Sequence, residues 1–210
     1  MTILGRSLIA TIVFALLLTV HLSSCTDSTG DGHCIMPADV ELCRGDVVFR
    51  LGGGMESHAV MMMDTHGRYS HVGIVVDTLD RLMIVHAVPG EPDFDGDVDR
   101  VKVDSIEKFF GSVYANRGEV VRCSDSAIAR KASENAMAIC RRGTLFDHDY
   151  NSSDTTKMYC TELVMYAYEK AGLRLTEREP HSISLPLLKA EVYYPSDIYD
   201  CKKLKSIRKF

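Results

Sequence analysis

Two β-branched runs separated by a short polar turn restrict the fold of this chain more than any other feature. The runs are Tyr69–Val76 and Leu82–Ala87, and residues 77–81 lie between them. Short runs rich in valine and isoleucine favour strands, and a brief polar connection favours a hairpin. Because both runs are mostly apolar, we expect this hairpin to lie in the core of a sheet.

The same kind of pattern predicts the other elements. Further strands are expected at residues 45–50, 100–103 and 119–122. Helices are expected at residues 55–64, 126–141 and 159–171, the last two because their apolar residues form one helical stripe. Gly172 is placed to end the last of these helices. Helices with a mainly antiparallel sheet, and no repeated strand–helix–strand units, predict an α+β fold without a second domain.

The N-terminal residues have the composition of an export signal. Arg6 precedes the uncharged apolar run Leu8–Val20. This run is shorter than the ~20 residues that a membrane-spanning helix needs, so a signal peptide is favoured over a permanent anchor helix. The following residues, Leu22–Cys25, resemble the bacterial lipobox, in which the cysteine is lipidated and becomes the new N-terminus.

This pattern predicts three parts of the chain. They are a lipoprotein signal peptide at 1–24, a tether and N-terminal segment at 25–43, and a single domain at 44–210. A lipid on Cys25 would hold the exported protein at a membrane of the bacterial cell envelope. The alternative is an ordinary signal peptide with a cysteine at this position by chance.

Composition excludes some classes of partner. The chain carries 24 Lys and Arg against 29 Asp and Glu, a net charge of −5, so nucleic acid is not an expected partner. Six cysteines follow Cys25, and export would permit disulfides. Cys34, Cys43 and Cys201 flank the expected core, where a disulfide is plausible, but the connectivity cannot be deduced from sequence.

Three residues stand in positions that suit cysteine chemistry. Cys160 begins an amphipathic helix directly after a polar loop, His71 opens a predicted strand, and His86 lies near the end of the next one. A helix N-terminus and a neighbouring imidazolium both stabilise a thiolate, and together they can lower a thiol pKa from ~8.5 to about 3.5–7.5. We therefore expect an activated thiol at Cys160, although a lone buried cysteine is more often part of a core.

The motifs around these residues resemble the circularly permuted, papain-like NlpC superfamily, and most closely its YaeF/YiiX-like amidases. The similarity spans roughly residues 44–200. The matching segments are 45–49, 69–75, 84–87, 146–150, 159–164 and 194–197. The resemblance implies a permuted papain-like fold, in which an antiparallel sheet packs against helices and the motif histidine precedes the motif cysteine.

The resemblance also implies roles for the residues. Cys160 would be the nucleophile, His71 the general base, and His86 the third group that orients His71 through one ring nitrogen. Many relatives carry a carboxylate at this third position, whereas related acyltransferases carry a second histidine. Tyr69 and Tyr159 flank the motifs and are candidates to line the cleft, with packing as the alternative.

Two groups of acidic residues near the motifs are assigned structural roles rather than catalytic or metal-binding ones. Glu162 lies about 200° around the helix from Cys160, so a salt bridge or hydrogen bond is favoured over a catalytic role. Asp147, His148 and Asp149 lack the spacing of zinc or calcium sites and are interpreted as a solvated loop. Neither a metal nor a cofactor is expected.

Three functions remain open from sequence. The first is an amidase or peptidase that forms a cysteine thioester, acting on cell-wall peptides. The second is a hydrolase or acyltransferase acting on lipids or N-acyl compounds, with amide or ester substrates. The third is a non-catalytic envelope binding module, which the intact Cys160 and His71 argue against. A narrow polar groove would favour a peptide substrate, and a deep apolar pocket beside Cys160 would favour an acyl chain.

Overall fold

The computed structural model describes residues 32–151, 154–185 and 188–210. The expected signal peptide, Cys25 and the start of the tether lie outside these ranges. Within the described residues, no helix combines the length and apolar character needed to cross a bilayer.

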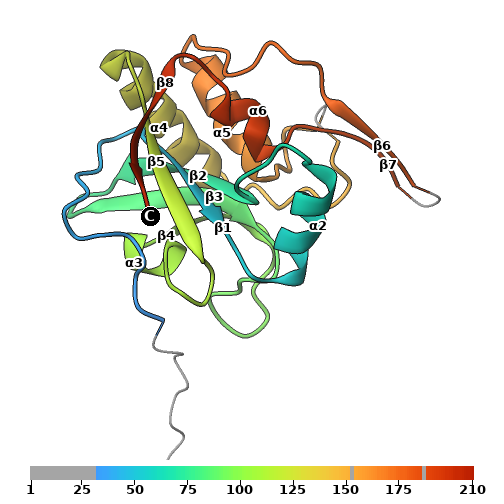
Figure 1. Cartoon of the computed structure of the whole chain (residues 1–210), viewed down its shortest axis with the longest axis horizontal. Coiled ribbons are helices and arrows are strands. Elements are labelled where there is room, and N and C mark those ends of the chain that lie inside the picture. The colour runs from blue at the N-terminus through green and yellow to red at the C-terminus, as the bar shows by residue number, and fades with distance from the viewer. Residues whose placement is uncertain (1–31, 152–153, 186–187) are drawn as a thin grey trace, which may run out of the picture. The chain divides into compact units, whose positions relative to one another are not determined.

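A six-stranded antiparallel sheet forms the centre of the fold, in the order β4-β3-β2-β1-β5-β8 (Figure 1). Its strands are β1 (Val47–Leu51), β2 (His71–Asp77), β3 (Leu82–Val88), β4 (Arg100–Asp104), β5 (Arg117–Cys123) and β8 (Leu204–Lys209). The predicted hairpin is confirmed as the adjacent strands β2 and β3, in which Ile74 pairs with Val85. Valines and isoleucines dominate these strands because their branched side chains pack well on a pleated surface.

Helices α4 (Ser126–Arg141) and α5 (Cys160–Lys170) cover one face of the sheet and contact each other. Both were predicted, and their apolar stripes join strand residues such as Phe49 and Ile74 in the main core. Asp125 caps α4 by accepting hydrogen bonds from the backbone N–H groups of Ala127 and Ile128. Gly172 has a φ of +97°, as expected of a residue that ends α5.

The other face of the sheet packs against a second, smaller core. This core contains Val48, Val75, Phe109 and Phe110, and the short helix α3 (Ile106–Phe109) contributes to it. Residues 34–42 lie against the same cluster, so the end of the predicted N-terminal segment packs on the sheet. Because successive side chains of a strand point to opposite faces, Val48 and Val75 face this smaller core and their neighbours on the same strands face the main core.

Three further elements lie outside the sheet. They are α2 (Met55–Met63), α6 (Pro195–Tyr199) and a separate hairpin of β6 (His181–Leu185) and β7 (Leu188–Val192). This hairpin extends away from the six-stranded sheet (Figure 1). The α+β prediction is correct, and the fold is an antiparallel sheet packed against helices.

The six cysteines after Cys25 are all free thiols. The described residues therefore contain no disulfide, and the one that sequence made plausible at Cys34, Cys43 or Cys201 is not formed in this structure. Cys34 instead forms an isolated β-bridge with Gly111.

Candidate active site

Cys160 is the first residue of α5, and Tyr159 is its N-cap. Helix α5 packs against β2, and the backbone N–H of Val72 acts on the Cys160 thiol. The thiol also lies 3.8 Å from the hydroxyl oxygen of Thr161. The residue is half-buried, so part of it stays accessible. The thiol is thus held beside the start of β2, where His71 is the first residue.

The expected lowering of the thiol pKa is wrong. Burial raises the pKa of Cys160, and the hydrogen bonds from Thr161 and from the backbone N–H groups of Val72 and Cys160 itself lower it by less. Burial prevails because a thiolate loses hydration that a few N–H donors only partly replace. In the resting protein, Cys160 is therefore a neutral thiol.

His71 and His86 form a direct hydrogen bond. The distance between Nε2 of His71 and Nδ1 of His86 is 2.9 Å, and both side chains are buried. Gly73 follows His71 by two residues on β2, and a Cβ there would be 3.3 Å from that of His86 and 2.7 Å from Cγ2 of Ile84. The absence of a side chain at Gly73 allows β3 to pack this closely beside His71.

Asp104 extends this pair into a hydrogen-bonded chain of three residues. Asp104 was not among the site residues predicted from sequence. Its Oδ2 lies 3.0 Å from Nε2 of His86, and its side chain is 4% exposed. Two lysines pair with the same carboxylate, Lys102 at 3.2 Å and Lys108 at 3.1 Å. Asp104 ends β4, whose register with β3 brings it to the face of the sheet that carries His86.

The two histidines are neutral at rest. Burial lowers the pKa of His71 well below its ordinary value, and the charges of Arg50, His86 and Lys102 lower it further. Burial also lowers the pKa of His86, while its hydrogen bond to Asp104 acts in the opposite direction. Burial alone would raise the pKa of Asp104, but His86 and the two lysines outweigh it and lower that pKa strongly. The site therefore holds two neutral rings beside one carboxylate.

Arg50 places a buried positive charge next to this chain. It pairs with His71 in the β1–β2 register, and its guanidinium binds Glu91 and the carbonyl oxygen of Phe109. Burial lowers the pKa of Arg50, and the nearby carboxylates of Glu91 and Asp104 raise it. Arg50 therefore lies within electrostatic range of the carboxylate that bonds His86.

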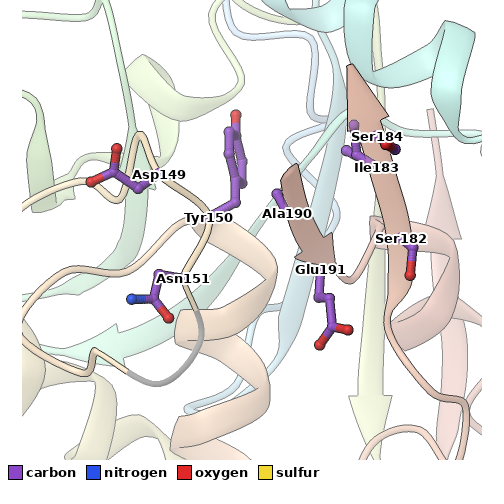
Figure 2. Close-up of a pocket in the computed structure, with 8 residues that line it drawn as sticks. All are labelled: Asp149, Tyr150, Asn151, Ser182, Ile183, Ser184, Ala190 and Glu191. Atoms are coloured by element: carbon purple, nitrogen blue, oxygen red, sulfur yellow. The ribbon is translucent and has the colours of Figure 1, made fainter. Parts of the chain in front are cut away.

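The structure contains a groove with a volume of about 670 Å³, and Cys160, His71 and His86 are not among its lining residues. Residues 149–151 form one side and the β6–β7 hairpin forms the other (Figure 2). Tyr150 is the lining residue that relates the groove to the candidate site, because its ring centroid lies 5.3 Å from that of Tyr159, the residue before Cys160. Burial raises the pKa of Tyr150. The residues that line it are mostly polar: Asp149, Tyr150, Asn151, Ser182, Ile183, Ser184, Ala190 and Glu191.

The two tyrosines singled out from sequence are both buried. The Tyr69 hydroxyl donates a hydrogen bond of 2.7 Å to Glu119, and the Tyr159 hydroxyl accepts one of 3.0 Å from the backbone N–H of Tyr193. Tyr69 borders a small separate cavity of about 140 Å³. Tyr159 supports Tyr150, which itself lines the larger groove.

Glu162 is buried, and of the salt bridge or hydrogen bond expected for it, the structure has a hydrogen bond from the backbone N–H of Tyr159. Its Oε2 has no hydrogen-bond partner. Burial and the nearby charge of Asp147 raise the pKa of this carboxyl group to about 8, although the bond from Tyr159 acts in the opposite direction. Glu162 is therefore largely protonated at neutral pH.

The solvated loop predicted at 147–149 is correct only in part. His148 and Asp149 are exposed and pair with Asp99 and Lys157. Asp147 is buried instead, because its carboxylate accepts hydrogen bonds from the backbone N–H groups of Asp149 and Asn151 at 3.0 and 2.6 Å. Across the described residues, no group of three or more His, Cys, Asp or Glu is arranged to hold a metal ion.

Comparisons with known proteins agree with this fold. A family model described as "Permuted papain-like amidase enzyme, YaeF/YiiX, C92 family" matches residues 41–207. Among solved structures, the chain is similar to the crystal structure of the metalloprotein YiiX from Escherichia coli O157:H7. The TM-score is 0.60 with 21% sequence identity, and the match covers 80% of this chain and 97% of that chain. No curated protein matches the chain. The matched range includes His71, His86, Asp104 and Cys160.

Proposed function

Since the chain belongs to the family of permuted papain-like amidases, we propose that it is a cysteine hydrolase that cleaves amide bonds in cell-wall peptides. The observation that carries this proposal is that the backbone N–H of Val72, the residue after His71, bonds the half-buried thiol of Cys160 at a helix N-terminus, while His71 is hydrogen-bonded to His86. A nucleophile, a base and a group that orients the base are the parts that acyl transfer through a thioester needs.

The mechanism follows from the neutral resting state. His71 takes the thiol proton at Nδ1, its ring nitrogen that is not bonded to His86, as the Cys160 sulfur attacks the substrate carbonyl carbon. The backbone N–H of Cys160, free of helical hydrogen bonds at the start of α5, stabilises the oxyanion. The C–N bond then breaks, and His71 returns its proton to the leaving amine. Water, deprotonated by His71, hydrolyses the thioester and restores the thiol.

The lining of the groove supports a peptide rather than an acyl chain as substrate. Six of its eight lining residues carry polar side chains, and Asp149 and Glu191 carry carboxylates. An acyl chain gains its binding free energy from apolar surface, which this groove offers at Ile183, Ala190 and the ring of Tyr150 among eight lining residues. Peptide amides and free amino groups can instead bond to the polar residues.

The similar YiiX protein is described as a metalloprotein. The described residues of this chain present no cluster of metal-binding side chains. The proposed mechanism accordingly uses only the chain's own thiol, imidazole and backbone groups.

Turnover of two substrate panels tests the proposal. Purified protein lacking residues 1–24 is incubated with cell-wall muropeptides, and separately with N-acyl amides and phospholipids, and products are identified by mass spectrometry. We expect cleavage of muropeptides, its loss in Cys160→Ala and its retention in Cys43→Ala, which removes an exposed thiol. Activity on the lipid panel alone would support a lipid hydrolase instead. Unchanged cleavage in Cys160→Ala, or no reaction with either panel, would contradict the proposal.

The proposed substrate requires a location in the bacterial envelope, and we propose that a lipid on Cys25 provides it. The apolar run and the Leu22–Cys25 motif support this assignment. Mass spectrometry of the mature protein from its native host should show an N-terminal diacylglyceryl cysteine at position 25. Cys25→Ser should remain uncleaved and carry no lipid. An unmodified N-terminus elsewhere in the wild type would contradict the anchor.

A further inference from the structure

We propose that Asp104 is a positioning residue, whose carboxylate sets the tautomers of His86 and His71 so that Nδ1 of His71 is free to accept a proton. This inference rests on the proposed function of Cys160 and His71, and it adds to them a residue from a different strand. Asp104 reaches the reaction only through His86, because its hydrogen bond is to that ring.

The geometry is a continuous hydrogen-bonded chain. Nε2 of His71 lies 2.9 Å from Nδ1 of His86, and Nε2 of His86 lies 3.0 Å from Oδ2 of Asp104. Each of these distances is that of an ordinary hydrogen bond. His86 is fully buried and Asp104 nearly so, which leaves water little access to compete for these bonds.

The direction of each hydrogen bond follows from the carboxylate. An ionised Asp104 can only accept, so His86 must carry its proton on Nε2. A neutral His86 then presents a lone pair at Nδ1, which accepts a proton from Nε2 of His71. A neutral His71 with its proton on Nε2 has its lone pair on Nδ1. One carboxylate therefore determines the proton positions on two rings.

The surroundings of Asp104 keep it ionised. Lys102 pairs with it from the same strand and Lys108 from α3, at 3.2 and 3.1 Å. Arg50 on β1 also lies close to Asp104, because the Asp104 carboxylate raises the pKa of Arg50. The nearby carboxylate of Asp93 also bonds both lysines, but it has no hydrogen bond to either histidine.

The same chain stabilises the charge that forms during the reaction. When His71 accepts the thiol proton at Nδ1, the resulting imidazolium still donates from Nε2 to His86. His86 in turn donates to Asp104, whose negative charge favours the cation across the pair. No proton moves beyond His71, so Asp104 stays ionised throughout.

Asp104→Asn tests the proposal, with Asp93→Asn as the matched control. An asparagine can donate to Nε2 of His86, which allows the opposite tautomers and places a proton on Nδ1 of His71. We expect kcat to fall roughly 100-fold, less than the ~10⁴-fold known for a carboxylate that orients the base directly, with KM unchanged. Asp93→Asn removes a carboxylate from the same two lysines and should keep kcat and KM near the wild-type values.

Nitrogen NMR of the histidine rings provides a readout that needs no substrate. The wild type and Asp93→Asn should show both His71 and His86 protonated at Nε2, and Asp104→Asn should shift His86 toward protonation at Nδ1. A wild-type spectrum with Nδ1 protonated on either ring would overturn the proposal, even if Asp104→Asn failed to fold. Unchanged tautomers in a folded Asp104→Asn would also overturn it. A wild type with the expected tautomers but no amidase activity would count against the proposed function and leave the role of Asp104 standing.

Discussion

The His71→Ala variant is expected to lose about 10²–10⁴-fold in kcat on the amide substrate, because it removes the group that takes the thiol proton. The neutral thiol cannot compensate, since burial raises the pKa of Cys160 and little thiolate exists at pH 7. Steady-state kinetics on the cleaved muropeptide measure the loss. His148→Ala, which removes an exposed histidine paired with Asp99, should keep wild-type kinetics. Wild-type kcat in His71→Ala would exclude His71 as the base.

The pH dependence of thiol alkylation separates this mechanism from that of a preformed thiolate–imidazolium pair. Alkylation of Cys160 by iodoacetamide should be slow at neutral pH and rise with a midpoint above the ~8.5 of a free thiol. Because the His71 ring is already neutral at rest, His71→Ala should keep this high midpoint. Alkylation followed by mass spectrometry of the Cys160 peptide gives both curves. A wild-type midpoint between about 3.5 and 7.5 would instead indicate a preformed ion pair.

The Gly45→Ala variant is expected to be less stable by about 2–5 kcal/mol, from left-handed backbone strain and overpacking together. Gly45 has a φ of +83°, and a Cβ there would lie 2.1 Å from the carbonyl oxygen of Ala129. That atom belongs to the backbone of α4, so the helix would have to move away from the sheet. Each kcal/mol lowers the melting temperature by about 2–4 °C in a domain of this size, so thermal unfolding followed by circular dichroism resolves the change.

Gly143→Ala is the matched control for this substitution. Gly143 has a similar φ of +75°, but no atom lies within 4 Å of the position that its Cβ would occupy. It should therefore show only the backbone strain, about 1–2 kcal/mol. Equal losses of stability in the two variants would contradict a close contact between Gly45 and α4.

The parts of the fold that sequence predicted are those with a strong apolar pattern. The β2–β3 hairpin and the helices α4 and α5 were recognised because their buried residues repeat with the period of a strand or helix. Strand β8 was missed because it lies at the sheet edge and is exposed along most of its length, with lysines and an arginine among its residues. The β6–β7 hairpin was also missed, and its two five-residue strands form a separate sheet outside the main one.

The sequence identified only those site residues that lie in short recognisable motifs. His71 and His86 were recognised together, and they are hydrogen-bonded in the structure. Asp104 could not be assigned, because only the β3–β4 register brings it near His86. The alternation of charged residues with Val101 and Val103 on β4 was a signal, but such a pattern usually indicates a face exposed to solvent. Here the charged side chains are paired with one another, which allows that face to be buried.

The groove and the hydrogen-bonded chain are built from different stretches of sequence. The groove lies between residues 149–151 and the β6–β7 hairpin, whereas His71, His86 and Asp104 lie on three neighbouring strands of the central sheet. A hairpin outside the sheet can exchange its surface residues without shifting the strands that hold the proton acceptor. A substitution on β6 or β7 can thus alter the lining of the groove and leave the geometry of β2, β3 and β4 intact.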